Sequence, residues 1–224
     1  MSGFLDYFQF SVFMLYISLF VGRIIYLNWR NGISAIAVTI DGSKVRGILT
    51  ICLIAIITIW FVVMISGIVD PEVSLLPPSL EIILIDSVQT QIAGVILVIL
   101  GFVVFTSAWF TLGNYWRVGN REENDSELIT HGIYAISRNP IYLFFILYLA
   151  GSFLINGTLI FLILTGLIAL NLHYLTLEEE AFLFRTHGMS FRDYCTVTGR
   201  YITWFKIWPM SRLRLSSRCP ECSE

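Results

Sequence analysis

Hydrophobic residues occur along this chain in five long runs that short polar segments separate. The runs cover residues 8–28, 48–69, 89–113, 141–154 and 158–175. The first three reach about 20 residues, the length at which an α-helix crosses about 30 Å of hydrocarbon. The fourth run is shorter, and Asn156 and Gly157 predict a turn between it and the fifth. We therefore expect an all-α, polytopic membrane helix bundle of about five transmembrane helices. The last two runs form either a tilted pair of spans or a re-entrant hairpin.

The composition also indicates an integral membrane protein. The 224 residues are 56% hydrophobic and 13% charged, with a mean hydropathy of +0.77. Soluble domains average roughly 45–50% apolar and 25% charged residues. The net charge of -2 is too small to indicate a nucleic-acid partner. The first run has no Lys or Arg before it and no small-residue cleavage pattern after it, so we expect an anchor that is retained.

The basic residues predict an orientation in the membrane. All 14 Lys and Arg residues lie in or beside the 29–47 loop, the 114–140 loop and the C-terminal third. The 70–87 loop contains none of them and carries four carboxylates. By the positive-inside rule, the N-terminus and the 70–87 loop face outward and the three basic regions face the cytoplasm. A prokaryotic plasma membrane and an endoplasmic reticulum membrane fit this pattern equally.

The cytoplasmic C-terminal region has its own pattern. Residues 177–187 are compatible with a helix, and Gly188 is a plausible stop. Aromatic residues then recur among Arg and Lys, as is typical of a region at the membrane surface. The four cysteines predict no disulfide framework. A zinc site usually needs four ligands, so we expect Cys219 and Cys222 to belong to a flexible, unligated tail.

Polar residues that could carry chemistry are concentrated in two regions, Asn114–Tyr142 and Glu178–Arg200. The predicted topology places both at the cytoplasmic ends of the last three apolar runs, where they could form one pocket. Neither region contains a glycine-rich phosphate loop, a Ser-His-Asp order, an HExxH motif or a dinucleotide fingerprint.

In the first region, Pro140 fits the first position of a helix, where its missing N–H costs nothing. A helix that starts near Asn139 presents unpaired N–H groups and a positive dipole end, which can hold a carboxylate. Further donors are Arg138, Tyr134 and Tyr142. The alternative is an ordinary helix start with an interfacial arginine and a belt of tyrosines.

In the second region, Glu178, Glu179 and Glu180 follow directly on an apolar helix. Negative charge is unfavourable at a helix C-terminus, so either the helix continues or the carboxylates have cationic partners. Carboxylates at membrane depth indicate function if they point inward. The alternative is a solvated helix flank at the interface.

Together, the two regions resemble the isoprenylcysteine carboxyl methyltransferase and phospholipid methyltransferase superfamily. The pattern G-x-Y-x-x-x-R-H-P-x-Y is met by GIYAISRNPIY, and E-E-x-x-L-x-x-x-F-G-x-x-Y-x-x-Y by EEAFLFRTHGMSFRDY. The matching residues are Gly132, Tyr134, Arg138, Pro140, Tyr142, Glu179, Glu180, Leu183, Gly188 and Tyr194. The resemblance covers about residues 110–205, including LGNYW at 112–116.

This chain departs from the family pattern at several positions. Asn139 replaces the usual His, His187 a Phe and Phe191 a Tyr. Members that methylate a prenylcysteine carboxylate tend to carry an Arg one turn before the glutamate pair, where it could clamp that carboxylate. Here the position is Leu175. This difference counts against a carboxylate acceptor but not against methyl transfer.

The resemblance implies an integral membrane methyltransferase that uses S-adenosyl-L-methionine and needs no metal. The acceptor would be lipidic or membrane-partitioned: an isoprenylcysteine-type carboxylate, a phospholipid amine or a thiol. The residues implied in cofactor binding are Leu128, Ile129, Tyr134, Asn139, Pro140, Ile141, Tyr142 and Glu179. Arg138 and Glu180 are the implied catalytic residues. The alternatives are a membrane sterol- or steroid-type reductase with a nicotinamide cofactor, and a small transporter or scaffold.

The expected organisation has three parts. Residues 1–110 form the first three transmembrane helices, 111–205 the methyltransferase-like catalytic region with a helical hairpin at 141–175, and 206–224 a flexible tail. The expected partners are membrane lipids and an amphiphilic or lipid-linked substrate that enters from the bilayer. The sequence indicates no nucleic-acid partner and no obligate protein partner.

Overall fold

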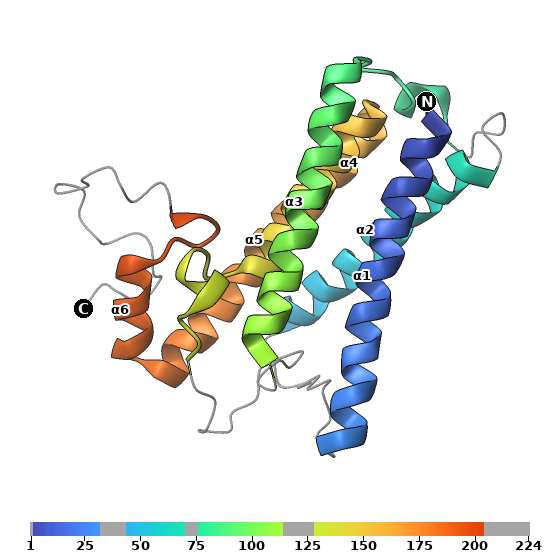
Figure 1. Cartoon of the computed structure of the whole chain (residues 1–224). Helices are drawn as coiled ribbons and strands as arrows, with labels where there is room; N and C mark the ends of the chain where they lie inside the picture. Colours follow the sequence, from blue (N-terminus) through green and yellow to red (C-terminus); the bar gives the residue numbers. More distant parts are fainter. Residues whose placement is uncertain (1, 32–43, 70–75, 114–127, 204–224) are drawn as a thin grey trace.

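The structure is a computed structural model that describes residues 2–31, 44–69, 76–113 and 128–203 (Figure 1). Among these residues there is no strand, only an isolated antiparallel bridge between Ile83 and Thr158. The predicted all-α class is therefore confirmed. The elements are α1 (Ser2–Asn31), α2 (Lys44–Val69), η1 (Pro78–Leu80), α3 (Val88–Leu112), η3 (Gly132–Ala135), α4 (Pro140–Asn156), α5 (Leu159–His187) and α6 (Met189–Val197).

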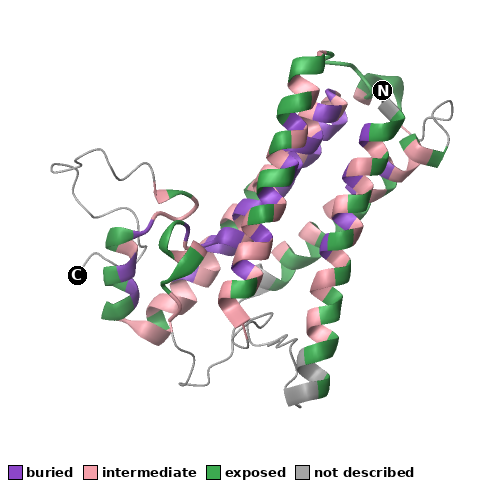
Figure 2. Cartoon of the chain, viewed as in Figure 1, coloured by how far each residue is buried: buried purple, intermediate pink, exposed green. Residues whose placement is uncertain are grey.

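Four of the described helices are long and apolar enough to cross a membrane. They contain the segments Gly3–Tyr26, Gly47–Val69, Val88–Leu112 and Leu159–His187. The fourth apolar run forms α4, which has 17 residues and is a shorter apolar helix. This agrees with the predicted bundle of about five membrane helices. Figure 2 shows the buried residues concentrated along α4 and on the faces of α3 and α5 that pack against it.

Helices α3 and α4 approach most closely at two glycines. A Cβ atom added to Gly94 would lie 2.6 Å from the Gly151 carbonyl oxygen, and one added to Gly151 would lie 2.6 Å from the Gly94 oxygen. Small residues let membrane helices pack with their backbones close together. This contact fixes α4, whose first residues belong to the candidate site, against α3.

An aromatic cluster at the centre of the bundle joins α1, α2, α3 and α4. The Phe13 ring centroid lies 5.2 Å from that of Trp60, and the Tyr16 centroid lies 4.9 Å from those of Phe105 and Phe144. These separations fall in the range of about 4.5–7 Å that is favourable for aromatic pairs. The cluster therefore packs α1 and α2 onto the α3–α4 pair.

The turn at Asn156 and Gly157 is present as predicted and ends α4. Gly157 has a φ of 67°, and a Cβ atom there would collide with the carbonyl of Ile85. The Gly157 carbonyl also accepts hydrogen bonds from the N–H groups of Leu84 (2.7 Å) and Ile85 (3.1 Å). After this turn, α5 runs back toward the end of the bundle at which α4 began.

Helix α5 continues through the three glutamates, which is one of the two alternatives that their position predicted. It ends at His187, and Gly188 with a φ of 54° separates it from α6. The predicted helix at 177–187 and the predicted stop are thus confirmed. The expected flexible tail at 206–224, which includes Cys219 and Cys222, lies outside the described residues. The division at residues 110 and 205 stays a prediction.

Candidate functional site

The described parts of the two polar regions, residues 128–142 and 178–200, meet at one end of the bundle, which we call the site end (Figure 1). Residues 114–127 of the first region lie outside the described residues. There η3 lies against the last turn of α3, where Gly132 faces Thr111. The Tyr194 hydroxyl of α6 donates to the Tyr134 carbonyl at 2.5 Å. The segment after α6 lies beside the residues that precede α4, and the Arg138 N–H donates to the Gly199 carbonyl at 3.0 Å.

Helix α4 begins at Pro140 with Asn139 as its N-cap, as predicted. The Asn139 side chain does not cap its own helix. Its Nδ2 atom instead donates to Glu180 Oε1 at 3.1 Å and to the Arg200 carbonyl at 3.2 Å. Its backbone N–H lies 3.2 Å from both Ser137 Oγ and the Arg200 carbonyl. The residue that replaces the family histidine therefore links α4, α5 and the segment after α6.

Glu180 is the centre of a charged cluster. Its side chain is buried, and Oε2 accepts from Arg200 Nη2 at 2.7 Å and from Arg200 Nε at 3.0 Å. Its Oε1 lies 3.3 Å from Arg138 Nη2. Two guanidinium groups and one carboxylate give +2 − 1, a formal charge of +1. A buried carboxylate requires such partners because its desolvation is costly.

Arg138 faces the interior of the site, which contradicts the alternative of an interfacial anchor. Its side chain is 11% exposed, and its Cζ atom lies 6.0 Å from the centroid of the Phe191 ring. Its Nη1 group donates to Cys195 Sγ. Its Nε group is buried and has no hydrogen-bond partner among the described residues. Since an unsatisfied buried donor is unfavourable, this atom indicates a place where a ligand could accept a hydrogen bond.

Two tyrosines adjoin the cluster. Burial raises the pKa of Tyr134 far above its usual range, and the charge of Glu179 raises it further. Burial also raises the pKa of Tyr194, although the neighbouring Arg138 partly opposes this rise. Both hydroxyls are therefore protonated at neutral pH. Because the charge of the half-buried Glu179 acts on the Tyr134 pKa, this carboxylate lies near η3.

The structure brings some of the predicted site residues together and separates others. Arg138, Asn139 and Glu180 are in direct contact. Pro140 is fully buried beside them, and Leu128 and Ile129 are half-buried in the segment that leads to η3.

The side chains of Ile141 and Tyr142 are half-buried and pack in hydrophobic clusters. Ile141 packs among Phe20, Ile24 and Leu112, and Tyr142 packs against the aromatic core. The predicted part of Ile141 and Tyr142 in cofactor binding stays a prediction.

The main residue that sequence reasoning missed is Arg200. It was counted only among the basic residues of the C-terminal region, yet it makes the closest ion pair of the cluster. Ser137 and Cys195 were also missed. Arg200 reaches Glu180 only because the segment after α6 returns to the start of α4, so the spacing of residues in the sequence does not predict this pair.

The fold and the charged site define an integral membrane helix bundle with a polar, partly buried site at one end. Residues 89–190 match the family described as phospholipid methyltransferase. The match covers α3, α4, η3 and α5 and ends in the first turn of α6, so it includes both glutamates and the Arg138–Pro140 motif. It confirms the resemblance over this region and implies methyltransferase activity. No match to the chain was found among curated proteins.

Proposed function

We propose that the protein is an S-adenosylmethionine-dependent methyltransferase that acts on a lipidic or membrane-partitioned acceptor. The observation that carries the proposal is the convergence of the α4 helix start with the glutamate pair at the site end. Within that convergence, Arg138 Nε is a buried donor without a described partner. The family match supports methyl transfer, and the geometry supports the place where it would occur.

The residues at the site fit the polar groups of this cofactor. The N–H groups in the first turn of a helix have no intrahelical partner, and together with Arg138 Nε they would bind the cofactor's carboxylate. Glu179, which faces Tyr134, would pair with its ammonium group. Leu128 and Ile129 would provide an apolar wall for the adenine. When bound, the cofactor supplies a methyl group on a sulfonium, which is an electrophilic carbon.

Within this proposal, Glu180 is a positioning residue. Its oxygen Oε1 lies close to Arg138 and its oxygen Oε2 pairs with Arg200. The negative charge of Glu180 is thereby paired with two arginines of the protein rather than with the cofactor's ammonium group. Arg138, in contrast, would contact the bound cofactor through Nε. Rigid placement of such groups lowers the barrier of a displacement reaction, because the reacting atoms must be aligned.

The exposed apolar surface near the site supports a route for the acceptor through the bilayer. Phe110 in the last turn of α3 is 74% exposed, and Ile136 beside η3 is 53% exposed. An amphiphile could therefore approach the site laterally while a water-soluble cofactor enters from the aqueous side. By the distribution of Lys and Arg, we propose that this aqueous side is the cytoplasm.

The first test is a calorimetric titration of the detergent-solubilised protein with S-adenosylhomocysteine. We expect wild-type protein to bind and Glu179→Gln to lose about tenfold or more in affinity, as for a lost hydrogen bond to a charged group. Glu178→Gln is the matched control, because it removes the neighbouring carboxylate and should retain affinity. Unchanged affinity of Glu179→Gln would contradict the assigned cofactor contact.

The same titration separates the reaction classes. Binding of a reduced nicotinamide dinucleotide without binding of S-adenosylhomocysteine would favour the reductase alternative. Binding of neither compound would favour a non-catalytic protein. A transfer assay with a labelled methyl group, in native lipid and with a panel of lipid amines, prenylated cysteines and thiols, would then identify the acceptor.

A further inference from the structure

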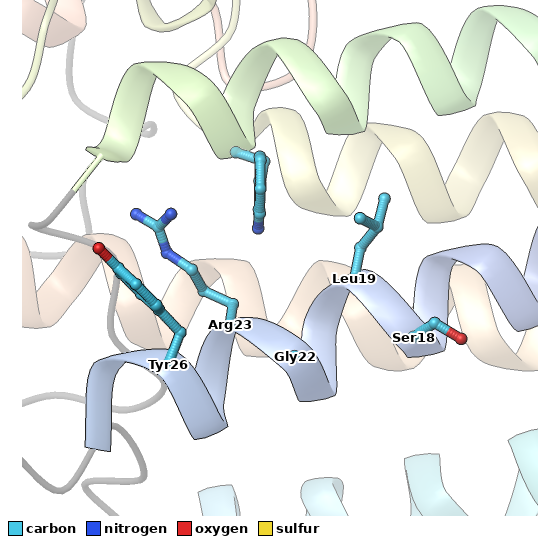
Figure 3. Close-up of a pocket in the computed structure, with 6 residues that line it drawn as sticks. Ser18, Leu19, Gly22, Arg23 and Tyr26 are labelled. Carbon is cyan, nitrogen blue, oxygen red and sulfur yellow. The ribbon is translucent and has the colours of Figure 1, made fainter. Parts of the chain in front are cut away.

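A cavity lies between α1 and α3, away from the charged cluster. It has a volume of about 330 Å³ and is lined by Ser18, Leu19, Gly22, Arg23, Tyr26 and Trp109. Figure 3 shows Arg23 and Tyr26 of α1 reaching side by side toward the end of α3. Ligand pockets in proteins typically measure about 300–1,000 Å³, so this cavity can hold part of a lipid molecule.

Two side chains at this cavity, Arg23 and Trp109, each have a buried hydrogen-bond donor without an acceptor among the described residues. Arg23 donates through Nη2 to the Gly113 carbonyl, and its Cζ atom lies 5.0 Å from the centroid of the Trp109 ring. Its Nε group and the Trp109 Nε1 group are both buried and have no hydrogen-bond partner among the described residues. None of the described residues that line the cavity carries a carboxylate.

The charge of Arg23 is also unbalanced. No ion pair with a carboxylate is formed by Arg23 within the described part of the chain. The Gly113 carbonyl at the C-terminal end of α3 supplies only a partial negative charge. A guanidinium that is partly buried, with a free donor beside an indole N–H, matches an anion with several acceptor oxygens, and phosphate is such an anion.

The position of the cavity identifies the source of that phosphate. Arg23 stands near the end of the apolar segment Gly3–Tyr26, at the level where a spanning helix leaves the hydrocarbon. Phosphate groups of membrane lipids lie at this level, and Trp and Tyr are enriched there. Leu19, Gly22 and the Trp109 ring give the cavity an apolar wall, which suits the glycerol and first acyl carbons of a lipid.

We propose that this cavity binds the phosphodiester group of a membrane glycerophospholipid, with Arg23 and Trp109 as its donors. The bland alternative is an arginine that only extends to the headgroup layer, as long basic side chains do at helix ends. That alternative needs neither the cavity nor the indole donor. The proposed site is independent of the assigned methyl transfer, because none of its residues belongs to the charged cluster.

The test is native mass spectrometry of lipid retained by protein from vesicles with equal amounts of phosphatidylglycerol, phosphatidylcholine and a phosphate-free galactolipid of the same acyl chains. We expect wild-type protein to retain both phospholipids over the galactolipid. Arg23→Gln should reduce this preference by about tenfold, the effect of losing a charge-assisted hydrogen bond. Arg192→Gln, which changes an exposed arginine of α6, is the matched control and should keep the preference.

Two further variants separate the cavity from simple charge attraction. Leu19→Trp fills the cavity without changing charge, and Trp109→Phe removes the indole donor but keeps a ring; both should reduce the preference. Equal retention of all three lipids by wild-type protein, or an unchanged preference in Leu19→Trp, would overturn the proposal. Displacement of the lipid by millimolar inorganic phosphate would instead identify free phosphate as the occupant and overturn the lipid assignment.

Discussion

Two polar clusters join the helices of this bundle at its opposite ends, and they differ in charge. At the end with the Gly157 turn, the buried Gln9 of α1 accepts hydrogen bonds through Oε1 from Ser152 Oγ (2.6 Å) and Asn156 Nδ2 (3.0 Å). Its carbonyl accepts a third from the Tyr148 hydroxyl at 2.9 Å. At the site end, the cluster is made of Glu180, Arg138, Arg200 and Asn139.

In the neutral cluster the described polar groups have hydrogen-bond partners, whereas in the charged cluster one buried donor has none among the described residues. The described groups around Gln9 satisfy one another, as expected of a network that fixes helix positions. Counted over Arg138, Arg200 and Glu180, the charged cluster has a formal charge of +1, and Arg138 Nε is a donor without a partner among the described residues. A buried charge and a buried donor without an acceptor both lower the stability of the folded protein. If the cluster served only to pack the helices together, neutral side chains could do so at a smaller cost. The contrast separates a cluster that fixes helix positions from the cluster that we propose as a ligand site.

The largest effect is expected when the charged cluster is broken. Glu180→Gln leaves two buried guanidinium groups without their carboxylate, so it should lower the free energy of unfolding by about 3–5 kcal/mol. It should also abolish methyl transfer and S-adenosylhomocysteine binding. Thermal unfolding in detergent and the calorimetric titration measure these effects. Asp193→Asn, which neutralises an exposed carboxylate on α6, is the control and should change neither quantity.

A smaller effect is expected from the neutral cluster. Gln9→Leu leaves the Ser152 hydroxyl and the Asn156 amide without their acceptor and should lower the free energy of unfolding by about 1–3 kcal/mol. The affinity for S-adenosylhomocysteine should stay at the wild-type value, because Gln9 lies at the opposite end of the bundle. If Gln9→Leu weakened cofactor binding as strongly as Glu180→Gln, the assignment of separate roles to the two clusters would be wrong.

The smallest effect concerns the tyrosines of the site and appears only in alkali. The pKa of Tyr194 is raised in the folded protein, mainly by burial, so the unfolded chain loses this proton first as pH rises. Its contribution is therefore fully present below about pH 10, the usual pKa of tyrosine, and is lost above it. Thermal unfolding between pH 8 and 12 should show a falling midpoint. Tyr194→Phe should show a shallower fall, and an equally steep fall would exclude Tyr194 as its source.

Much of the fold follows from local signals in the sequence. Pro140 marks the start of α4, Gly157 its end, and Gly188 the end of α5, because each of these residues acts on its own backbone. Apolar runs predicted the helix cores but not their full extent. Helix α1 begins at Ser2 and α5 continues to His187, since polar residues at either end lengthen a helix without adding to an apolar run.

The candidate site could be predicted only in part. The convergence of the Arg138–Pro140 motif with the glutamates was expected from topology and is present. The roles of the two glutamates could not be separated, because their difference arises from tertiary partners: Glu180 meets two arginines, whereas Glu179 faces Tyr134. Arg200 escaped for the same reason. Glu180 and Arg200 are 20 residues apart, and Gly188 ends the helix between them. Their ion pair therefore cannot be recognised from helical periodicity.

The position of Arg200 also bears on how the protein is made. The stretch 199–203 binds to residues 136–139 through the Gly199 and Arg200 carbonyls and through Thr203, whose N–H donates to the Ile136 carbonyl at 3.0 Å. A ribosome synthesises this stretch after all the helices of the bundle, so α4 and α5 enter the membrane before Glu180 can meet its closest cation. Completion of the charged cluster is therefore a late event in biogenesis, and chains that stop before residue 199 would insert as a bundle but lack a finished site.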